Sequence, residues 1–265
     1  MSQTFRELSE LALVVAKEAG AGLLSGFRSR PEVVLKGPVD LVTEWDRRSE
    51  DLIRTRLLKL CPNIPVVGEE TGGEFSNKLT FYCDPLDGTT NFVHGHPFFA
   101  VSIGAMEDGI PVAGAVFAPA LNYFWSGSRE HGSYRNGTLC RVSETQKLGD
   151  TLLATGFPPV RNRTPHSNLD AYVRAKPFVR GIRRCGSASI DLCFVGDGTY
   201  DGYWERALHA WDLVAGAAVV LAAGGTVTAL DGGTARLEIG HIVASNGILH
   251  PDLLRLVGEQ PLQLP

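Results

Sequence analysis

The chain has 265 residues, of which 44% are hydrophobic and 20% are charged, and its formal net charge is −4. These values are typical of a soluble globular protein with one large domain or two closely packed ones. The acidic balance argues against broad electrostatic binding to nucleic acid or to an anionic membrane. The most apolar run, residues 213–223, is shorter than the roughly 20 residues that a membrane-spanning helix needs.

The cysteines predict a reducing compartment. They are odd in number and show no C-x-x-C spacing, so we expect free thiols in a cytoplasmic protein. A free cysteine behaves as a small apolar residue, and packing is the expected role of all five. They are Cys61, Cys83, Cys140, Cys185 and Cys193.

The first half of the chain predicts two helices followed by short strands. Apolar residues recur at helical spacing over residues 4–25, and a second helix is expected to open at residues 43–46 and to end before Pro62. A short strand is expected between them at residues 33–35. From residue 64 to about 140, short β-type runs alternate with turn residues. This order favours an α+β half.

The second half predicts alternating strands and helices, which favours an α/β half with helices on the sheet faces. The helix near its end is apolar on all sides and should therefore be buried. No linker or repeat separates the halves, so we expect residues 1–150 and 151–265 to fold as one unit. The expected elements are strands at 151–155 and 180–184 and helices at 166–174, 188–194 and 211–223.

The string CDPLDGTTNF at residues 83–92 is the most informative segment. It places Asp84 and Asp87 three residues apart on an expected turn, with a glycine and two hydroxyls where a helix can begin. Carboxylates at this spacing can share Mg²⁺, which prefers oxygen ligands and leaves room for phosphate oxygens. The N–H groups of a helix start can bind an anion. The string therefore indicates chemistry on a phosphate ester.

Two further carboxylates occupy similar positions. Glu69 follows the apolar Val66-Val67-Gly68, and Asp212 stands at the head of the buried helix. Alone, the Glu69-Glu70 pair is typical of a solvated loop, Asp84 and Asp87 of a type I turn, and Asp212 of an N-cap. Together, four carboxylates at the ends of apolar elements would repel one another unless cations neutralised them. This favours a Mg²⁺ site.

Three segments, GEE at 68–70, DPLDGTTNF at 84–92 and WDLVAG at 211–216, resemble the signatures of the inositol monophosphatase family. This family comprises Mg²⁺-dependent, lithium-sensitive phosphomonoesterases. The resemblance runs from about residue 5 to 255. It implies a layered αβαβα sandwich of the sugar-phosphatase type, with an N-terminal antiparallel sheet and two helices followed by a mixed α/β half. Supporting strings lie at residues 40–43, 181–183, 186–188 and 203–205.

The resemblance also implies roles for individual residues. The implied ligands of two or three Mg²⁺ ions are Glu69, Asp84, the Leu86 carbonyl, Asp87 and Asp212. The implied substrate contacts are Lys36, Asp87, Gly88, Thr89, Gly186, Ser187, Ala188, Glu205 and Asp212. The implied catalytic residues are Glu69, which helps to hold the water-activating metal, and Thr89 with Asp46, which take a proton from that water. Asp46 has a rival explanation, because Thr43-x-x-Asp46 is close to a capping box.

The substrate is expected to be an inositol monophosphate, hydrolysed to inositol and phosphate. Thr90-Asn91-Phe92 resembles that branch of the family, whereas the nucleotide and histidinol branches tend to carry a basic residue at the position of Thr90. Glu205 can accept hydrogen bonds from vicinal hydroxyls, but it could equally attract a histidinol ammonium. Histidinol phosphate, fructose 1,6-bisphosphate and 3′-phosphoadenosine 5′-phosphate are the alternative substrates.

A second class of function stays open. The resemblance also covers bacterial binding proteins in transcription and ribosome assembly, and a cluster of basic residues could form a docking surface. Because all the implied metal ligands are present, an enzyme is the favoured interpretation. The resemblance further implies a homodimer. The basic residues are Arg174, Lys176, Arg180, Arg183 and Arg184.

Overall fold

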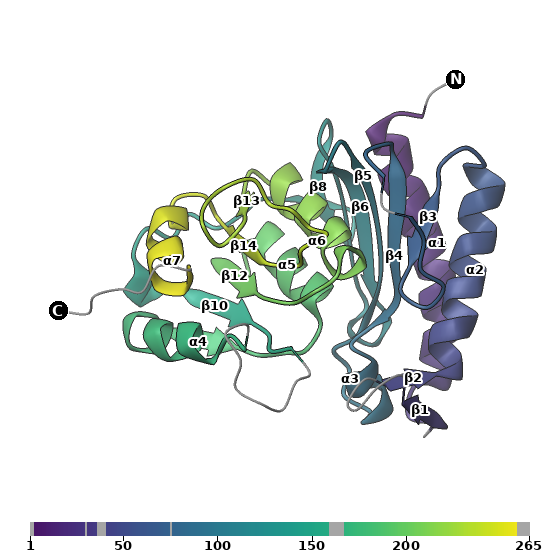
Figure 1. Cartoon of the computed structure of the whole chain (residues 1–265), viewed down its shortest axis with the longest axis horizontal. Coiled ribbons are helices and arrows are strands. Elements are labelled where there is room, and N and C mark those ends of the chain that lie inside the picture. Colours follow the sequence, from purple (N-terminus) through teal and green to yellow (C-terminus); the bar gives the residue numbers. More distant parts are fainter. Residues whose placement is uncertain (1–2, 30, 36–40, 75, 159–166, 259–265) are drawn as a thin grey trace.

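Helices and sheets alternate as layers through the molecule (Figure 1). A computed structural model describes residues 3–29, 31–35, 41–74, 76–158 and 167–258. Two long helices cover one face of a large sheet, a second pair of helices lies between this sheet and a smaller one, and two short helices cover the smaller sheet's outer face (Figure 1). This is the predicted αβαβα order.

The outer pair of helices is α1 (Phe5–Gly26) and α2 (Glu44–Leu60). Helix α1 begins with a capping box between Thr4 and Glu7, and its apolar stripe is buried against the large sheet. Helix α2 begins with the box formed by Thr43 and Asp46. Each box satisfies backbone N–H groups that have no partner within their helix. Both predicted N-terminal helices are confirmed.

The large sheet has the strand order β3-β4-β5-β6-β7-β8-β9, with β3 and β4 parallel and the other pairs antiparallel. Its central strands are nearly continuous apolar runs, because helices cover both of their faces. Strand β4 is buried along its whole length. The strands are β3 (Val66–Gly68), β4 (Thr80–Asp87), β5 (Ala100–Glu107), β6 (Ile110–Ala118), β7 (Tyr123–Ser128), β8 (Gly132–Arg135) and β9 (Thr138–Cys140).

The inner helices are α5 (Ala188–Gly196) and α6 (Ala210–Ala222). Helix α6 packs so closely on the large sheet that a Cβ atom on Gly114 would lie 2.6 Å from the Ala215 carbonyl oxygen. This contact requires glycine on the strand. The helix is buried almost completely, as its uniformly apolar sequence predicted.

The smaller sheet has the order β11-β10-β12-β14-β13 and mixes parallel with antiparallel pairs. Helices α4 and α7 pack together on its outer side (Figure 1). These elements are β10 (Leu152–Thr155), α4 (Leu169–Ala175), β11 (Gly181–Arg183), β12 (Gly202–Glu205), β13 (Thr226–Thr228), β14 (Ile242–Ser245) and α7 (His250–Val257).

Short elements complete the described chain. A small hairpin, β1 paired with β2, precedes helix α2, and helix α3 follows β4 directly. None of the helices in the described ranges has both the length and the apolar character needed to cross a bilayer. The short elements are β1 (Val33–Leu35), β2 (Leu41–Thr43), α3 (Thr89–Val93) and the 3-10 turns Pro119–Leu121, Leu148–Asp150 and Lys176–Phe178.

The structure corrects one local expectation. Asp84 and Asp87 lie not on a free turn but in the last part of strand β4, where the register with β5 shifts between the two residues. Such an irregularity re-aims side chains at a strand end. The large sheet ends at Cys140 and the smaller one begins at Leu152. Folding of the two halves as one unit stays a prediction.

Candidate active site

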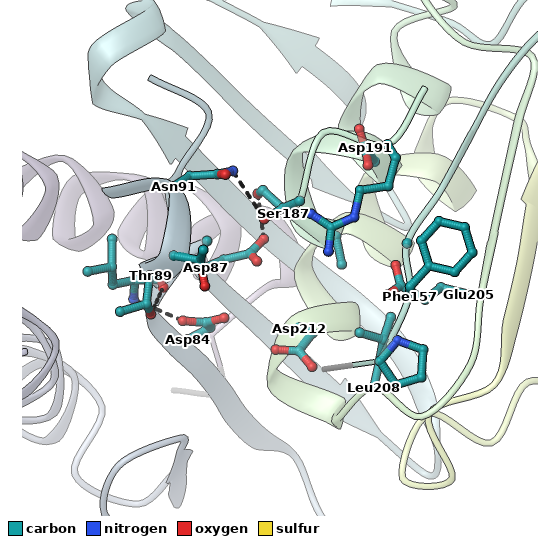
Figure 2. A pocket seen from close by; sticks show the side chains of 18 of the residues that line it. Asp84, Asp87, Thr89, Asn91, Phe157, Ser187, Asp191, Glu205, Leu208 and Asp212 are labelled. Carbon is teal, nitrogen blue, oxygen red and sulfur yellow. Dashed lines mark hydrogen bonds between the residues drawn. The ribbon is translucent and has the colours of Figure 1, made fainter. Parts of the chain in front are cut away.

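A pocket of about 260 Å³ opens where β4 and α3 meet the inner helices and the end of β12 (Figure 2). The lining contains six carboxylates and, among the described residues, one basic side chain, Arg184. Figure 2 shows three of these carboxylates, from Asp84, Asp87 and Asp212, facing a common space. The acidic side chains of the lining are Glu69, Asp84, Asp87, Asp191, Glu205 and Asp212.

Asp84 and Asp87 reach the pocket through the irregular end of β4. Both are buried, and an Asp84 carboxylate oxygen accepts a hydrogen bond of 2.9 Å from the Leu86 N–H. This bond stabilises the bend, because it gives a buried backbone donor a charged acceptor. Gly88 follows with φ 93°, a left-handed conformation that suits glycine, and helix α3 starts at the next residue. The predicted helix start after Asp87 is confirmed.

Asp87 connects β4 to helix α5. One of its oxygens, Oδ2, accepts hydrogen bonds from the Ser187 hydroxyl at 2.6 Å, the Ser189 hydroxyl at 2.5 Å and the Ser189 N–H at 2.8 Å. These donors lie at the N-terminal end of α5, where a negative charge is favourable. The carboxylate thus fixes the start of α5, with Gly186, Ser187 and Ala188, against the end of β4.

Asp212 is the third residue of α6 rather than its N-cap. The N-cap is His209, whose N–H donates to an Asp212 carboxylate oxygen at 2.7 Å. The interpretation of Asp212 as the N-cap is therefore wrong, because the N-cap lies three residues earlier in the chain. Glu69 comes directly after β3, the parallel neighbour of β4, and is half-buried. The strand-end position expected for Glu69 is confirmed.

The carboxylates raise one another's proton affinity. Burial raises the pKa of Asp84 well above its usual range, and the charges of Glu69, Asp87 and Asp212 raise it further. Burial, followed by the charge of Asp87, raises the pKa of Asp212 in the same way. Four acidic groups held in one buried space are a source of repulsion that a bound cation removes.

The donor set fits a hard divalent cation in its chemistry. The implied ligands supply only carboxylate and carbonyl oxygens, which Mg²⁺ prefers. Within the described ranges, no group of three or more His, Cys, Asp or Glu side chains is already arranged to hold a metal ion. Oxygens of Asp84, Asp87 and Asp212 instead accept hydrogen bonds from the protein. A cation would use their remaining oxygens or compete with these bonds.

Thr89 and Asp46 form a hydrogen-bonded pair beside the pocket. The Thr89 hydroxyl lies 3.0 Å from an Asp46 carboxylate oxygen and 3.1 Å from the Leu86 carbonyl oxygen, so it can donate to either. The other Asp46 oxygen accepts from the N–H and the hydroxyl of Thr43, both at 2.7 Å. Burial raises the pKa of Asp46. Asp46 therefore makes both the capping contacts and the Thr89 contact that the sequence left as alternatives.

Glu205 lies at the far end of the pocket from Asp84 (Figure 2). It is buried, accepts a hydrogen bond from the Tyr203 hydroxyl, and sits against Gly156, where any Cβ atom would overlap its carboxylate. Burial raises the pKa of Glu205 to about 7.

The pocket brings together nearly all of the predicted site residues. Asp46 is buried behind Thr89 and reaches the pocket through it. Lys36 lies outside the described residues. The predicted residues that line the pocket are Glu69, Asp84, Leu86, Asp87, Gly88, Thr89, Gly186, Ser187, Ala188, Glu205 and Asp212.

Sequence reasoning missed other parts of the lining, most notably Asp191. It is 2% exposed, and its Oδ1 atom has no hydrogen-bond partner among the described residues. No sequence signal marked it, because an aspartate within a short helix is usually solvated. Asn91 belongs to the 83–92 string but had no assigned role. Its amide donates to the carbonyls of Phe98, at 2.6 Å, and Cys185, at 2.9 Å, which joins α3 to the loop before α5.

The basic residues at positions 174–184 do not form one surface patch of side chains that lack contacts within the chain. Arg174 donates to the carbonyls of Leu256 and Gly258, and Arg180 pairs with Asp150. Arg184 lines the pocket. These contacts give three of the five residues roles within the chain.

The chain is similar to known proteins in its family model, in its sequence and in its structure. Residues 5–262 match the model of the inositol monophosphatase family. An inositol-1-monophosphatase of Mesorhizobium japonicum is 40% identical over 261 residues, 96% of this chain and 97% of that protein. A Nus factor SuhB of Pseudomonas aeruginosa is 42% identical over 250 residues, 89% of this chain and 90% of that protein.

The solved structure of an inositol monophosphatase from Anabaena superimposes with a TM-score of 0.87 at 35% identity, covering 97% of each chain. This match confirms the predicted fold class. The family match and the sequence relatives confirm the predicted class of enzyme, a phosphoric monoester hydrolase. The chain belongs to the inositol monophosphatase family.

Proposed function

We propose that the protein hydrolyses inositol monophosphate to inositol and phosphate in a Mg²⁺-dependent reaction. The observation that carries the proposal is that Glu69, Asp84, Asp87 and Asp212 converge on one pocket. There the charges of the other three destabilise the ionised form of Asp84, which raises its pKa. The names of the Mesorhizobium and Anabaena relatives support inositol phosphate as the substrate. Two or three ions, lithium sensitivity, a cytoplasmic location and a homodimer belong to the same proposal.

The residues that would hold the ions are the predicted ligands: Glu69, Asp84, the Leu86 carbonyl, Asp87 and Asp212. Divalent cations at such a site supply two effects, a lower pKa for an attacking water and charge stabilisation of the departing alkoxide. Phosphoryl transfer depends mainly on positioning and on charge stabilisation. The mechanism therefore needs no cysteine or histidine nucleophile.

Thr89 and Asp46 supply the proton path in this proposal. The Thr89 hydroxyl orients the attacking water. It takes a proton from that water as it passes its own proton to the Asp46 carboxylate, to which it is hydrogen-bonded. The backbone N–H groups of Gly88 and Thr89 are proposed to bind the phosphate. They stand at the bend between β4 and α3, beside the Asp84 and Asp87 carboxylates.

The far end of the pocket is proposed to bind the alcohol. Glu205 is fixed by Tyr203 and Gly156, so its orientation is set before substrate enters. A carboxylate held in this way can accept hydrogen bonds from adjacent sugar hydroxyls. Gly186, Ser187 and Ala188 border the space between Glu205 and the metal-binding carboxylates, with Ser187 held by Asp87.

The test is phosphate release from four esters, measured with Mg²⁺ and with EDTA. The esters are inositol 1-phosphate, fructose 1,6-bisphosphate, histidinol phosphate and 3′-phosphoadenosine 5′-phosphate. We expect Mg²⁺-dependent turnover with the highest kcat/KM for inositol 1-phosphate. A higher kcat/KM for another ester would reassign the substrate and leave the metal chemistry in place. Folded protein that hydrolyses none of the four would contradict the proposal.

A binding role is the second candidate function. It is favoured by one observation, the 42% identity to a Pseudomonas aeruginosa protein named a Nus factor. The sequence alternative of a protein that binds in transcription or ribosome assembly is consistent with that name. A variant that loses binding to a transcription or ribosome-assembly partner but keeps full phosphatase activity would separate the two functions.

A further inference from the structure

Glu50 is a buried carboxylate that the proposed mechanism leaves unused. It lies on helix α2, is 1% exposed, and is not part of the pocket lining. A charged group is rarely buried so completely unless it is paired or hydrogen-bonded. The partners of Glu50 therefore indicate what its burial accomplishes.

Among the described residues, its hydrogen-bond partners all belong to the turn after β3. The Glu70 N–H donates to Oε2 at 2.7 Å, and the N–H and hydroxyl of Thr71 donate to Oε1 at 2.9 and 2.5 Å. Both carboxylate oxygens are thus used by the two residues that directly follow Glu69. Hydrogen bonds to an ionised acceptor are stronger than those between neutral groups.

The backbone of the 68–72 turn allows the Glu50 carboxylate to approach it closely. Gly68 and Gly72 exchange backbone hydrogen bonds of 3.1 and 3.0 Å, which close the loop around residues 69–71. A Cβ atom on Gly68 would lie 2.4 Å from a Glu50 carboxylate oxygen, so only glycine permits this approach. The Glu69 N–H is also fixed, by the Cys83 carbonyl at 3.2 Å. The backbone on both sides of Glu69 is therefore held.

Glu69 borders two different spaces. One is the pocket with Asp84, and the other is a hollow of about 450 Å³ that it shares with Glu50, Thr71 and Arg47. The side chain of Glu69 is half-buried between these two spaces. The conformation of the turn sets the direction of the Cα–Cβ bond, and with it which space the carboxylate can reach.

We propose that Glu50 is a positioning residue that holds the 68–72 turn so that the Glu69 carboxylate is presented to the metal-binding pocket. The inference rests on the proposed function, in which Glu69 is a metal ligand. Residues that orient metal ligands typically change metal affinity or activity by about 10- to 100-fold when they are replaced. The effect of Glu50 should therefore appear in Mg²⁺ affinity.

The test is Mg²⁺ binding to the metal-free, full-length protein, measured by titration calorimetry on wild type and Glu50→Gln. Glutamine keeps the shape of the side chain but places an NH₂ group against N–H donors. We expect Mg²⁺ to bind about 10- to 100-fold more weakly. The Mg²⁺ concentration for half-maximal phosphate release should rise by a similar factor, with kcat at saturating Mg²⁺ within about threefold of wild type.

Two other variants keep the test interpretable. Glu18→Gln is the matched control, because Glu18 also bonds to helix α2, through Arg56 at 2.7 and 2.8 Å. Within the described ranges of the chain, no hydrogen bond joins Glu18 to the turn. It should leave Mg²⁺ affinity unchanged. If Glu50→Gln does not fold, Thr71→Val removes a single donor to Glu50 and should shift Mg²⁺ affinity in the same direction by a smaller factor, whereas Thr71→Ser should retain wild-type affinity.

The outcomes separate this inference from the proposed function. Unchanged Mg²⁺ affinity in Glu50→Gln and Thr71→Val, with wild type binding Mg²⁺ and releasing phosphate, overturns the positioning role alone. Wild-type protein that neither binds Mg²⁺ nor releases phosphate overturns both. An equal loss of affinity in Glu18→Gln would show that any weakening of helix α2 has this effect, which also overturns the specific role of Glu50.

Discussion

At the scale of single residues, Asp46 shows how one side chain serves two purposes. Its two oxygens face different donors, Thr43 at the start of α2 and Thr89 at the start of α3. The first contact stabilises a helix end and the second holds a hydroxyl beside the pocket. The two contacts use different oxygens and different threonines, so a substitution at one threonine can remove one contact and leave the other.

We predict that Asp46→Asn lowers kcat by about 100- to 10,000-fold, because the amide retains one acceptor and cannot polarise Thr89 as a carboxylate does. Stability should fall by about 1 kcal/mol through the weakened cap. Steady-state kinetics and thermal unfolding measure the two effects. Thr43→Ala is the control, which should lose similar stability while kcat stays within about threefold. Wild-type kcat in Asp46→Asn would contradict the catalytic role.

The predictability of individual site residues depended on their position in an element. Glu69, Asp84 and Asp87 could be predicted because each lies at or directly after the end of an apolar strand, and strand ends collect side chains in a crevice. Asp191 could not, because only the tertiary structure buries that face of α5 and removes the solvent that would pair with the carboxylate. The Glu50 contacts were equally hidden, since they join residues 20 and 21 positions apart.

At the scale of elements, the close contact between α6 and the large sheet positions Asp212. The helix backbone lies against strand glycines, with Ala215 only three residues beyond Asp212. A Cβ atom on Gly104 would lie 2.5 Å from the Ala215 nitrogen, and one on Gly114 would lie 2.6 Å from its oxygen. Strand and helix can approach this closely only where both strands lack a side chain.

We predict that Gly114→Ala destabilises the protein by about 1–3 kcal/mol or more, because two backbone segments must separate to admit the methyl group. Thermal unfolding should show a lower Tm, by about 2–4 °C for each kcal/mol. The matched control is Gly22→Ala on helix α1, where a Cβ atom would meet nothing within 4 Å. This change should be neutral or stabilise by up to about 1 kcal/mol. Wild-type stability in Gly114→Ala would contradict the close packing.

Element length explains which parts of the fold could be predicted. Helices α1 and α2 carry apolar residues at regular helical spacing over five or six turns, and α6 is a long apolar run, so their sequences were sufficient. Strands β13 and β9 have three residues each and no fully buried side chain. Their pairing is decided by neighbouring strands rather than by their own pattern. Strand β13 was therefore not predicted, and β9 was covered only by the general expectation of short strands up to about residue 140.

At the scale of the whole molecule, the layers bring distant segments to one place. Strand β4, the turn after β3, helix α6 and the end of β12 all meet at the pocket. Figure 2 shows Asp84, Glu205 and Asp212 around it. Burial makes their carboxylates repel strongly, and the layered packing holds them together despite this cost. The arrangement therefore favours a state in which cations are bound, since ligands that bind only the folded protein stabilise it.

The most direct test of this account is phosphate release by Asp84→Asn from inositol 1-phosphate at saturating Mg²⁺, with wild type measured alongside. We predict that kcat/KM falls by at least about 100- to 1000-fold, the range seen when a charge-stabilising group is removed from an active site. The Tm of the metal-free variant should be equal to that of wild type or higher, because the substitution removes a buried, repelled charge. Activity within about tenfold of wild type in this folded variant would contradict the metal-dependent mechanism.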